Sequence, residues 1–274
     1  MKKQSINWMK GLIWASAIFT VSLLILIVGF IFINGLGALK PSIFAWHYTT
    51  ENVSMMPAII TTLELVLGSL LIATPIGVFT GFYLVEYANR DSWFIPLIRL
   101  ATDTLAAIPS IVYGLFGMIL FVVRLNMQYS LLAGILTIAI MILPMIISST
   151  EEGLLSVNNN LRMGSLALGA GKLRTIFTVV LPVAMPGIVS GIILSIGRIV
   201  GETAALMFTL GTATGIAKNL MSSSRTLALH MYVLSSEGLH VQEAYATGAV
   251  LIVIVVIINA LSTKLSQYLS RGGQ

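Results

Sequence analysis

An all-helical integral membrane protein is the fold class that this sequence predicts, and both its composition and its apolar segments point to it. Of the 274 residues, 57% are hydrophobic and 9% are charged, and the mean hydropathy is +0.97. Soluble domains carry roughly 25% charged residues. The sequence has no cysteine and three scattered histidines, which excludes disulfides and thiolate metal sites and disfavours a histidine metal cluster.

Six apolar stretches are long enough to cross the roughly 30 Å of membrane hydrocarbon as helices. They lie near residues 11–34, 58–86, 104–123, 130–149, 184–210 and 244–263. The first follows two lysines, as a signal peptide does, but residues 11–39 contain no charge and no clear small-residue cleavage site. We therefore expect an uncleaved first helix and six transmembrane helices.

Lysine and arginine are distributed unevenly between the connecting segments, and cytoplasmic segments carry the excess in membrane proteins. With a cytoplasmic N-terminus, ten basic residues fall inside: Lys2, Lys3, Lys10, Arg90, Arg99, Arg162, Lys172, Arg174, Lys264 and Arg271. Four fall outside: Lys40, Arg124, Lys218 and Arg225. This bias predicts that both termini are cytoplasmic, and it explains the basic net charge without nucleic acid.

The cytoplasmic connection before the fifth stretch is the longest, and it predicts a helix-turn-helix. Residues 158–160 offer an N-cap, residues 161–168 a short helix and Gly169 a stop. A second helix is expected over residues 172–181, ended by Pro182. The leucines of this helix pair have to be buried, either against the chain's own bundle or in the groove of a cytosolic partner.

The fifth stretch contains two opposite charges, Arg198 and Glu202, one helical turn apart. On a continuous helix they share a face with Gly187 and Gly191. Charges at membrane depth are costly and mark either a solute path or a buried pair. The sequence leaves both open: contact with a solute, or a structural pair that fixes helix packing.

The cytoplasmic connection resembles the "EAA" loop of permease subunits in binding-protein-dependent ABC importers. Gly169, nine further residues and then Val179-Val-Leu-Pro182 match the family spacing, whereas Met163-Gly164-Ser165 stands where Glu-Ala-Ala is usual. The resemblance implies a MetI-like fold with a cytoplasmic coupling helix that docks on an ATPase. It assigns this coupling to Arg162, Leu166, Leu168, Gly169, Ala170, Leu181 and Pro182.

Further motifs together resemble the permeases of phosphate-specific ABC importers. They are Pro75-Ile-Gly77, Tyr83-Leu-Val-Glu-Tyr87, Ile108-Pro-Ser-Ile-Val-Tyr-Gly-Leu-Phe116 and Gly197-Arg-Ile-Val-Gly-Glu-Thr-Ala204. The last of these, with Phe208 and the later Leu-x-Leu-His-Met-Tyr232, looks like the PstA-type subunit rather than its PstC-type partner. The resemblance covers roughly residues 55 to 265. Because the EAA loop is shared across importers, a permease for another oxyanion or small solute is the alternative.

The resemblance implies a bacterial inner-membrane assembly with several partners. A second homologous permease of PstC type, two ATPase subunits of PstB type and a periplasmic phosphate-binding protein of PstS type are expected, with ATP and magnesium on the ATPase subunits. No catalytic residue, cofactor or metal is expected in this chain. Its nearest phosphate-loop lookalike, Gly169-Ala-Gly-Lys172, is followed by Leu173 instead of the Ser or Thr that holds magnesium.

Phosphate in a low-dielectric bundle needs a counter-charge, and the guanidinium fork of Arg198 fits its oxygens. Glu202 is expected to hold that fork when no anion is present. We expect residues 1–57 to form the first helix and first periplasmic segment, and residues 58–274 the permease core, with a coupling loop over about 150–183. An ion-gradient-driven secondary transporter is the alternative of another class, and it requires acidic residues in several spans.

Overall fold

The computed structural model describes residues 2–88 and 93–271, with side chains described for residues 8–88 and 93–264. Within these residues the chain forms helices and no strand, which confirms the predicted fold class. In chain order the elements are α1 (Lys2–Leu36), η1 (Pro41–Phe44), α2 (Met56–Phe82), η2 (Tyr83–Tyr87), α3 (Phe94–Ala107), α4 (Ser110–Gly117), η3 (Met118–Arg124), α5 (Leu131–Leu155), α6 (Asn159–Ala167), α7 (Lys172–Thr175), η4 (Ile176–Val180), α8 (Leu181–Val200), α9 (Ala204–Met207), α10 (Leu227–Glu237) and α11 (Val241–Arg271). Five described helical segments are long and apolar enough to span a membrane, and the bent pair α3–α4 makes a sixth if it is counted as one span.

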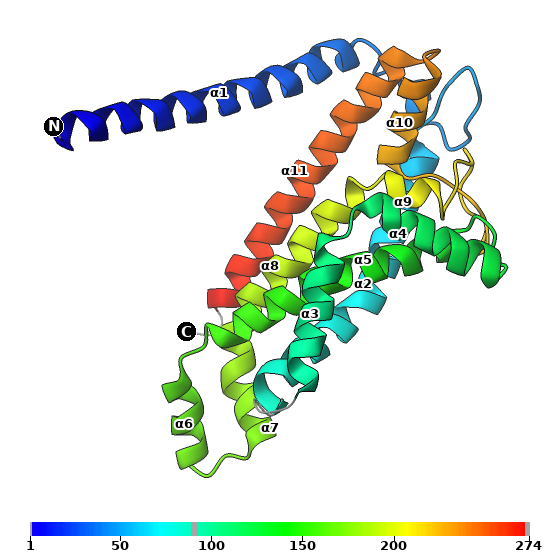
Figure 1. Ribbon diagram of the computed structural model, residues 1–274. Coiled ribbons are helices and arrows are strands. Elements are labelled where there is room, and N and C mark those ends of the chain that lie inside the picture. The colour runs from blue at the N-terminus through cyan, green and yellow to red at the C-terminus, as the bar shows by residue number, and fades with distance from the viewer. Residues whose placement is uncertain (1, 89–92, 272–274) are drawn as a thin grey trace.

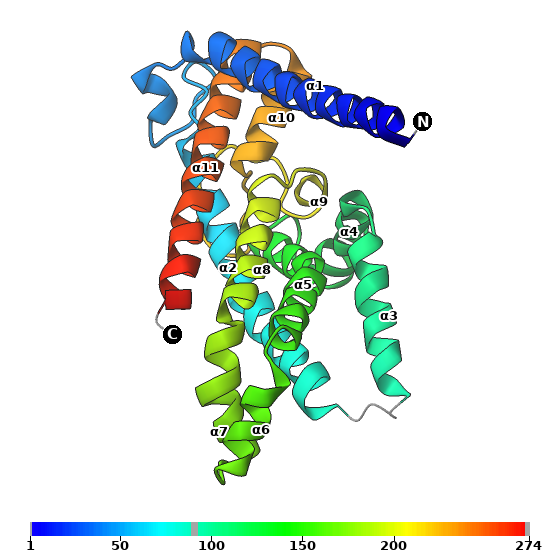
Figure 2. The ribbon, with the colours of Figure 1, turned by 90° about the vertical axis from the view of Figure 1, so that its left-hand side faces the viewer.

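Helix α5 packs against both α2 and α8, and in Figure 2 it lies between these two helices and the α3–α4 pair. Its side chains Ile138, Ile142 and Ile146 are completely buried. Helices α5 and α8 approach very closely, since a Cβ added at Gly187 would lie 2.8 Å from Cα of Gly153. Small residues let helix backbones meet in this way in membranes, where packing replaces the hydrophobic effect.

Helix α1 stands away from the rest of the bundle along most of its length (Figure 1). Its C-terminal part packs on α11, where the rings of Phe30 and Tyr245 meet edge to face at 5.6 Å. Toward its N-terminus Trp8, Trp14 and Phe19 are all exposed. This helix therefore presents apolar side chains on every side, as a lipid-facing helix does.

The third predicted span is wrong as a single helix over residues 104–123. The chain bends by 102° between α3 and α4. Pro109 causes the bend, because the residue before a proline is driven into extended conformation, and Ile108 has φ −69° and ψ 130°. The Tyr113 hydroxyl donates to the Leu105 carbonyl at 2.7 Å, so this carbonyl keeps a partner across the bend.

The fifth predicted span, over residues 184–210, is wrong at its C-terminal end. Helix α8 stops at Val200, and the separate short helix α9 begins at Ala204. Glu202 lies between them, and its Oε1 accepts a hydrogen bond from the Ala205 backbone N–H at 3.0 Å. A backbone donor is free for a buried carboxylate only where a helix begins, since the interior N–H groups are already used.

The predicted helix stop at Pro182 is also wrong. The helix runs from α7 through η4 into α8 and passes Pro182 without ending. η4 is a π-helical turn in which the Leu181 N–H reaches back to the Ile176 carbonyl. A wide turn directly before a proline relieves the clash between its ring and the preceding turn.

The connection between α1 and α2 (residues 37–55) packs against the one between α9 and α11 (residues 208–240) over buried polar side chains. We call these two connections the outer segments, because the charge bias predicts that they face away from the cytoplasm. Arg225 is 4% exposed and lies with its guanidinium carbon 5.0 Å from the Tyr48 ring centroid. His230 on α10 is 1% exposed, and neither of its ring nitrogens has a hydrogen-bond partner among the described residues. Burial, together with the nearby Arg225 charge, lowers the pKa of His230 from 6.5 to about 3.

The glycine contact between α5 and α8 predicts a difference between two substitutions in one helix. Gly187→Ala places a methyl group where no space exists and should destabilise the chain by about 1–3 kcal/mol. Gly197→Ala adds a methyl group that meets nothing within 4 Å, and it should leave stability unchanged or slightly higher. Thermal unfolding of the purified chain in detergent measures both, and equal melting temperatures would contradict the predicted contact.

His230 predicts that stability falls in acid. Because its pKa is lower in the folded chain, the unfolded chain binds one more proton below pH 6.5, so stability is lost as the pH falls from 6.5 toward 3. The loss from this group is at most about 1.4 kcal/mol per pH unit. His230→Phe should flatten the melting temperature in this window. The control, His47→Gln at an exposed position, should keep the slope.

Candidate functional site

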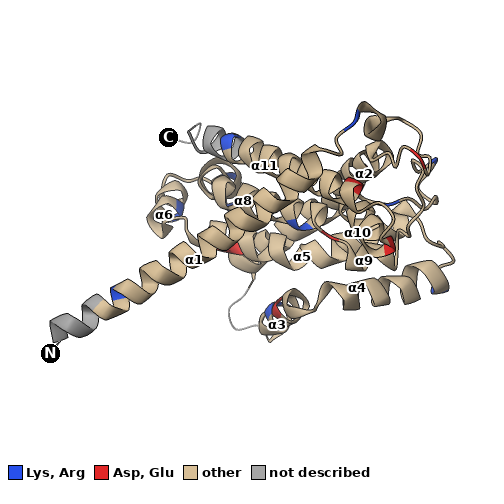
Figure 3. Ribbon diagram, turned by 90° about the horizontal axis from the view of Figure 1, so that it is seen from above, with Lys and Arg blue, Asp and Glu red and all other residues tan. Residues whose placement is uncertain are grey.

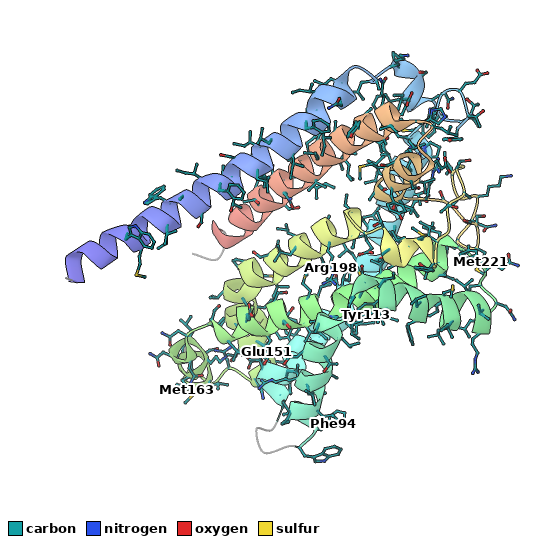
Figure 4. The ribbon with its side chains drawn as sticks, turned by 45° about the horizontal axis from the view of Figure 1, so that its top comes forward. Phe94, Tyr113, Glu151, Met163, Arg198 and Met221 are labelled. Atoms are coloured by element: carbon teal, nitrogen blue, oxygen red, sulfur yellow. The ribbon has the colours of Figure 1, made fainter. Side chains whose placement is uncertain are left out.

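Arg198 lies in the last turn of α8, where a positive charge complements the helix dipole. Its side chain is half-buried, and it makes no hydrogen bond or ion pair with the residues that the structure describes. Its charge acts on the hydroxyl of Tyr113 on α4, and Figure 4 shows the two residues near each other in the middle of the bundle. Arg198 is therefore a guanidinium within a candidate membrane span, and no described residue uses its donors.

Glu202 does not pair with Arg198, so the predicted arrangement of both charges on one helical face is wrong. Glu202 is 8% exposed, and its carboxylate is bound to the start of α9. Arg198 and Glu202 are four residues apart in the sequence, but α8 ends between them. Their side chains therefore do not share one helical face. The carboxylate holds the chain break in place, while the guanidinium remains available.

Two broken helices meet beside Arg198. Tyr113 on α4 packs in the same buried cluster as Ile199 and Val200 at the end of α8. Helices α4 and α9 touch through their backbones, because a Cβ at Gly114 would lie 2.8 Å from Cα of Ala205. Discontinuous helices within a membrane expose polar backbone only where protein or an aqueous cavity covers it, and solute sites of transporters are built from them.

The predicted helix-turn-helix is present, and it lies at the opposite end of the bundle from the outer segments (Figure 1). Asn158 caps α6 as predicted, with its side chain accepting from the N–H of Asn160 at 2.9 Å. Gly169 ends the helix with φ +84°, a backbone conformation that favours glycine. The Gly169 N–H donates to the Leu166 carbonyl at 3.0 Å, which closes the turn.

An apolar surface on α6 and its turn is left uncovered by the bundle. It consists of Leu161, Met163, Leu166, Leu168 and Gly169, and we call it the coupling surface. Leu168 is 90% exposed and Met163, labelled in Figure 4, is 60% exposed. Leu161, Leu166 and Leu168 are all exposed, so the chain's own bundle does not bury them. Of the two alternatives, burial by a partner therefore remains.

Arg162 lies on the same helix, but its side chain is used within the chain. Its Nε and Nη2 both lie 3.0 Å from Oε1 of Glu86 on η2. Nη1 and Nη2 donate to the carbonyls of Val157 and Leu154 at 2.7 Å each. Figure 3 marks the basic residue on α6, whereas charges are sparse along α1 and α11. Arg162 therefore fixes the position of α6.

The other residues assigned to coupling by the resemblance divide into two groups. Ala170 belongs to the turn, where its N–H donates to the Ser165 carbonyl at 3.2 Å. Leu181 and Pro182 lie at the base of α8, where Leu181 packs against the buried cluster that contains Leu154. Leu181 and Pro182 therefore belong to the packed base of the loop and do not line the coupling surface.

Sequence reasoning missed three polar contacts around the loop. Glu86 was noticed only as part of a motif, since its partner Arg162 lies 76 residues away in the chain. The Lys172 ammonium lies 4.5 Å from the ring centroid of Tyr87. The hydroxyls of Ser165 and Thr175 are 2.9 Å apart and join α6 to α7. Only a three-dimensional arrangement brings these residues together.

Comparison with known proteins places this architecture in a family. The probable ABC transporter permease protein YqgI of Bacillus subtilis is 30% identical over 272 residues, covering 91% of this chain and 90% of that protein. The phosphate transport system permease protein PstA of Haemophilus influenzae is 32% identical over 260 residues, covering 94% of this chain and 92% of that protein.

A solved structure shares the fold, as the MetI-like prediction requires. A chain of the inward facing MetNI methionine ABC transporter superposes with a TM-score of 0.63, covering 78% of this chain and 94% of that chain at 19% identity. Residues 73–272 match the family described as "Binding-protein-dependent transport system inner membrane component". This chain therefore belongs to the inner-membrane permease family of binding-protein-dependent ABC transport systems.

Proposed function

We propose that the chain is the PstA-type permease subunit of an ATP-driven phosphate importer, and that Arg198 contacts the anion on its way through. The observation that carries the proposal is the half-buried guanidinium, unpaired among the described residues, at the junction of two broken helices. The Haemophilus influenzae relative, a phosphate transport system permease, supports phosphate as the solute.

The charge arrangement suits an anion that has to pass and not stay. Phosphate carries between one and two negative charges near neutral pH, and a guanidinium offers it a fork of donors. Glu202 lies four residues beyond Arg198 with a buried carboxylate. A fixed negative charge near the path keeps the anion from binding too tightly, and conduction requires release as well as capture.

Cytosolic ATPase subunits of PstB type, which bind ATP and magnesium, dock on the coupling surface in this proposal. Leu166, Leu168, Gly169 and Ala170 form the contact, as an apolar helix seated in a groove. Arg162 holds the loop in position through its hydrogen bonds, and Leu181 and Pro182 lie at its packed base. The exposure of Leu168 beside buried polar contacts supports this division.

Partners of the family complete the assembly. A binding-protein-dependent ABC importer requires an ATPase and a solute-binding protein. We propose a PstC-type permease and a PstS-type phosphate-binding protein, in a bacterial inner membrane with both termini of this chain cytoplasmic. Residues 1–57 supply the first helix and periplasmic segment, and residues 58–274 supply the permease core with its coupling loop at about 150–183.

Another oxyanion or small solute is the second candidate, because coupling loops are shared across importers and the YqgI relative is named without a solute. Uptake of phosphate, sulfate and molybdate by cells lacking this chain, with and without its restoration, separates the candidates. The family match favours ATP-driven import over an ion-gradient-driven transporter.

Arg198→Ala should lower phosphate uptake by roughly 10- to 100-fold, because hydrogen bonds to a charged group are worth about 1.5–3 kcal/mol. Arg198→Lys should retain part of the uptake, since it keeps the charge but loses the fork. Arg124→Ala, at an exposed position on η3, is the matched control and should transport normally. Normal uptake by Arg198→Ala in an assembled complex would remove Arg198 from the path.

Leu168→Glu should weaken ATPase docking by roughly 30-fold, since interface anchors contribute about 2 kcal/mol or more. Its side chain is 90% exposed, so the isolated chain should keep its melting temperature. Leu239→Glu changes an 81% exposed leucine between α10 and α11, at the outer end, and should leave docking intact. Co-purification of the ATPase with each variant measures this, and full recovery with Leu168→Glu would contradict docking at this surface.

A further inference from the structure

Two neighbouring residues of η2 hold the coupling loop from both of its helices. Glu86 binds Arg162 of α6, and the Tyr87 ring lies under the Lys172 ammonium of α7. We call these four residues the cytoplasmic clamp. The Glu86–Arg162 pair is well shielded, with 10% and 16% of the two side chains exposed. The loop therefore cannot move relative to η2 without separating charges that are shielded from water.

The clamp is attached to one long helix. η2 continues α2 directly, so the contacts of Glu86 and Tyr87 act on the cytoplasmic end of α2. Arg162 also donates to two carbonyls at the end of α5, that of Leu154 in the helix and that of Val157 just beyond it, so all three of its guanidinium nitrogens are engaged. Because the guanidinium is held at several points, α6 has to move together with the ends of α2 and α5 that it contacts.

The opposite end of α2 is hydrogen-bonded to the outer segment. The Thr61 hydroxyl lies 2.7 Å from that of Ser224, and Ser224 donates to the Gly215 carbonyl at 2.8 Å. Oγ1 of Thr62 accepts from the Leu227 N–H, at the start of α10, at 2.9 Å. These groups are buried, with Thr61 completely so. Helix α2 is thus tied to the coupling loop at one end and to the outer segment at the other.

We propose that the Glu86–Arg162 pair is a positioning pair through which ATPase-driven movement of the coupling loop is passed along α2 to the outer segment around Lys218. The proposal rests on the proposed docking of an ATPase at the coupling surface. Arg198 lies in the last turn of α8, whereas α2 reaches the outer segment through the hydrogen bonds of Thr61 and Thr62.

The contrasting ion pair at the cytoplasmic side shows why Glu86 is singled out. Arg99 on α3 and Glu151 on α5 are 2.5 Å apart, but the Arg99 side chain is 50% exposed. That pair joins α3 to α5 and holds neither α6 nor α7. Glu151, labelled in Figure 4, therefore offers a matched control with the same chemistry.

The experiment uses the complete transporter in liposomes and follows a label on the outer segment. The natural chain has no cysteine, so Lys218→Cys gives this chain one thiol, at an exposed position. The rate of thiol modification is measured with and without ATP. Glu86→Gln should reduce the ATP-dependent change in this rate by about fivefold or more, while the ATPase still co-purifies. Glu151→Gln should leave the change unaffected.

A double variant separates transmission from simple stabilisation. Glu86→Gln with Arg162→Met removes both charges, so the melting temperature should recover relative to Arg162→Met alone, which leaves the shielded Glu86 charge unpaired, but the ATP-dependent change should stay lost. Thr62→Val cuts the outer end of α2 and should cause a similar loss. Adding Glu86→Gln to Thr62→Val should reduce the change no further.

Three outcomes would overturn the proposal. One is an ATP-dependent change that survives Glu86→Gln, another is a change that returns together with the melting temperature in the double variant, and the third is an outer segment that does not respond to ATP at all. An error in the proposed docking site is recognised separately. In that case Leu168→Glu would leave co-purification of the ATPase intact.

Discussion

Backbone polar groups inside a membrane must find their partners within the protein, because hydrocarbon offers none. This chain interrupts two helices within its bundle, and each interruption is matched by a side chain that restores a hydrogen bond. The Tyr113 hydroxyl serves the carbonyl of Leu105, and the Glu202 carboxylate serves the N–H of Ala205. Beside these breaks, Arg198 keeps donors that no described residue uses.

The same rule separates the roles of charges that look alike in the sequence. Arg162 and Arg198 both stand in helices, yet one is held by a carboxylate and two carbonyls and the other by no described residue. A guanidinium with all its donors engaged defines geometry, and one with free donors can receive a ligand. Burial alone does not distinguish them, and the distinction rests on partners.

Much of the fold could be predicted because hydrophobic length and helix signals are local. The spans, the cap at Asn158 and the turn at Gly169 all follow from residues within a few positions. The broken third span was missed because its apolar composition continues through Pro109. The free state of Arg198 was missed because periodicity assumes that a helix continues, and Glu202 ends that continuity by binding a new helix.

The separation of α1 from the bundle has a consequence for sequence divergence. From Trp8 onward most of its described side chains meet no complementary surface in this chain, so a replacement there is constrained by hydrophobicity and length more than by shape. Substitutions in α5 face neighbours on most sides and are constrained by volume. Residues 73–272 carry the family match and α1 lies outside it. The N-terminal helix is therefore where related permeases can diverge furthest while the buried framework stays recognisable.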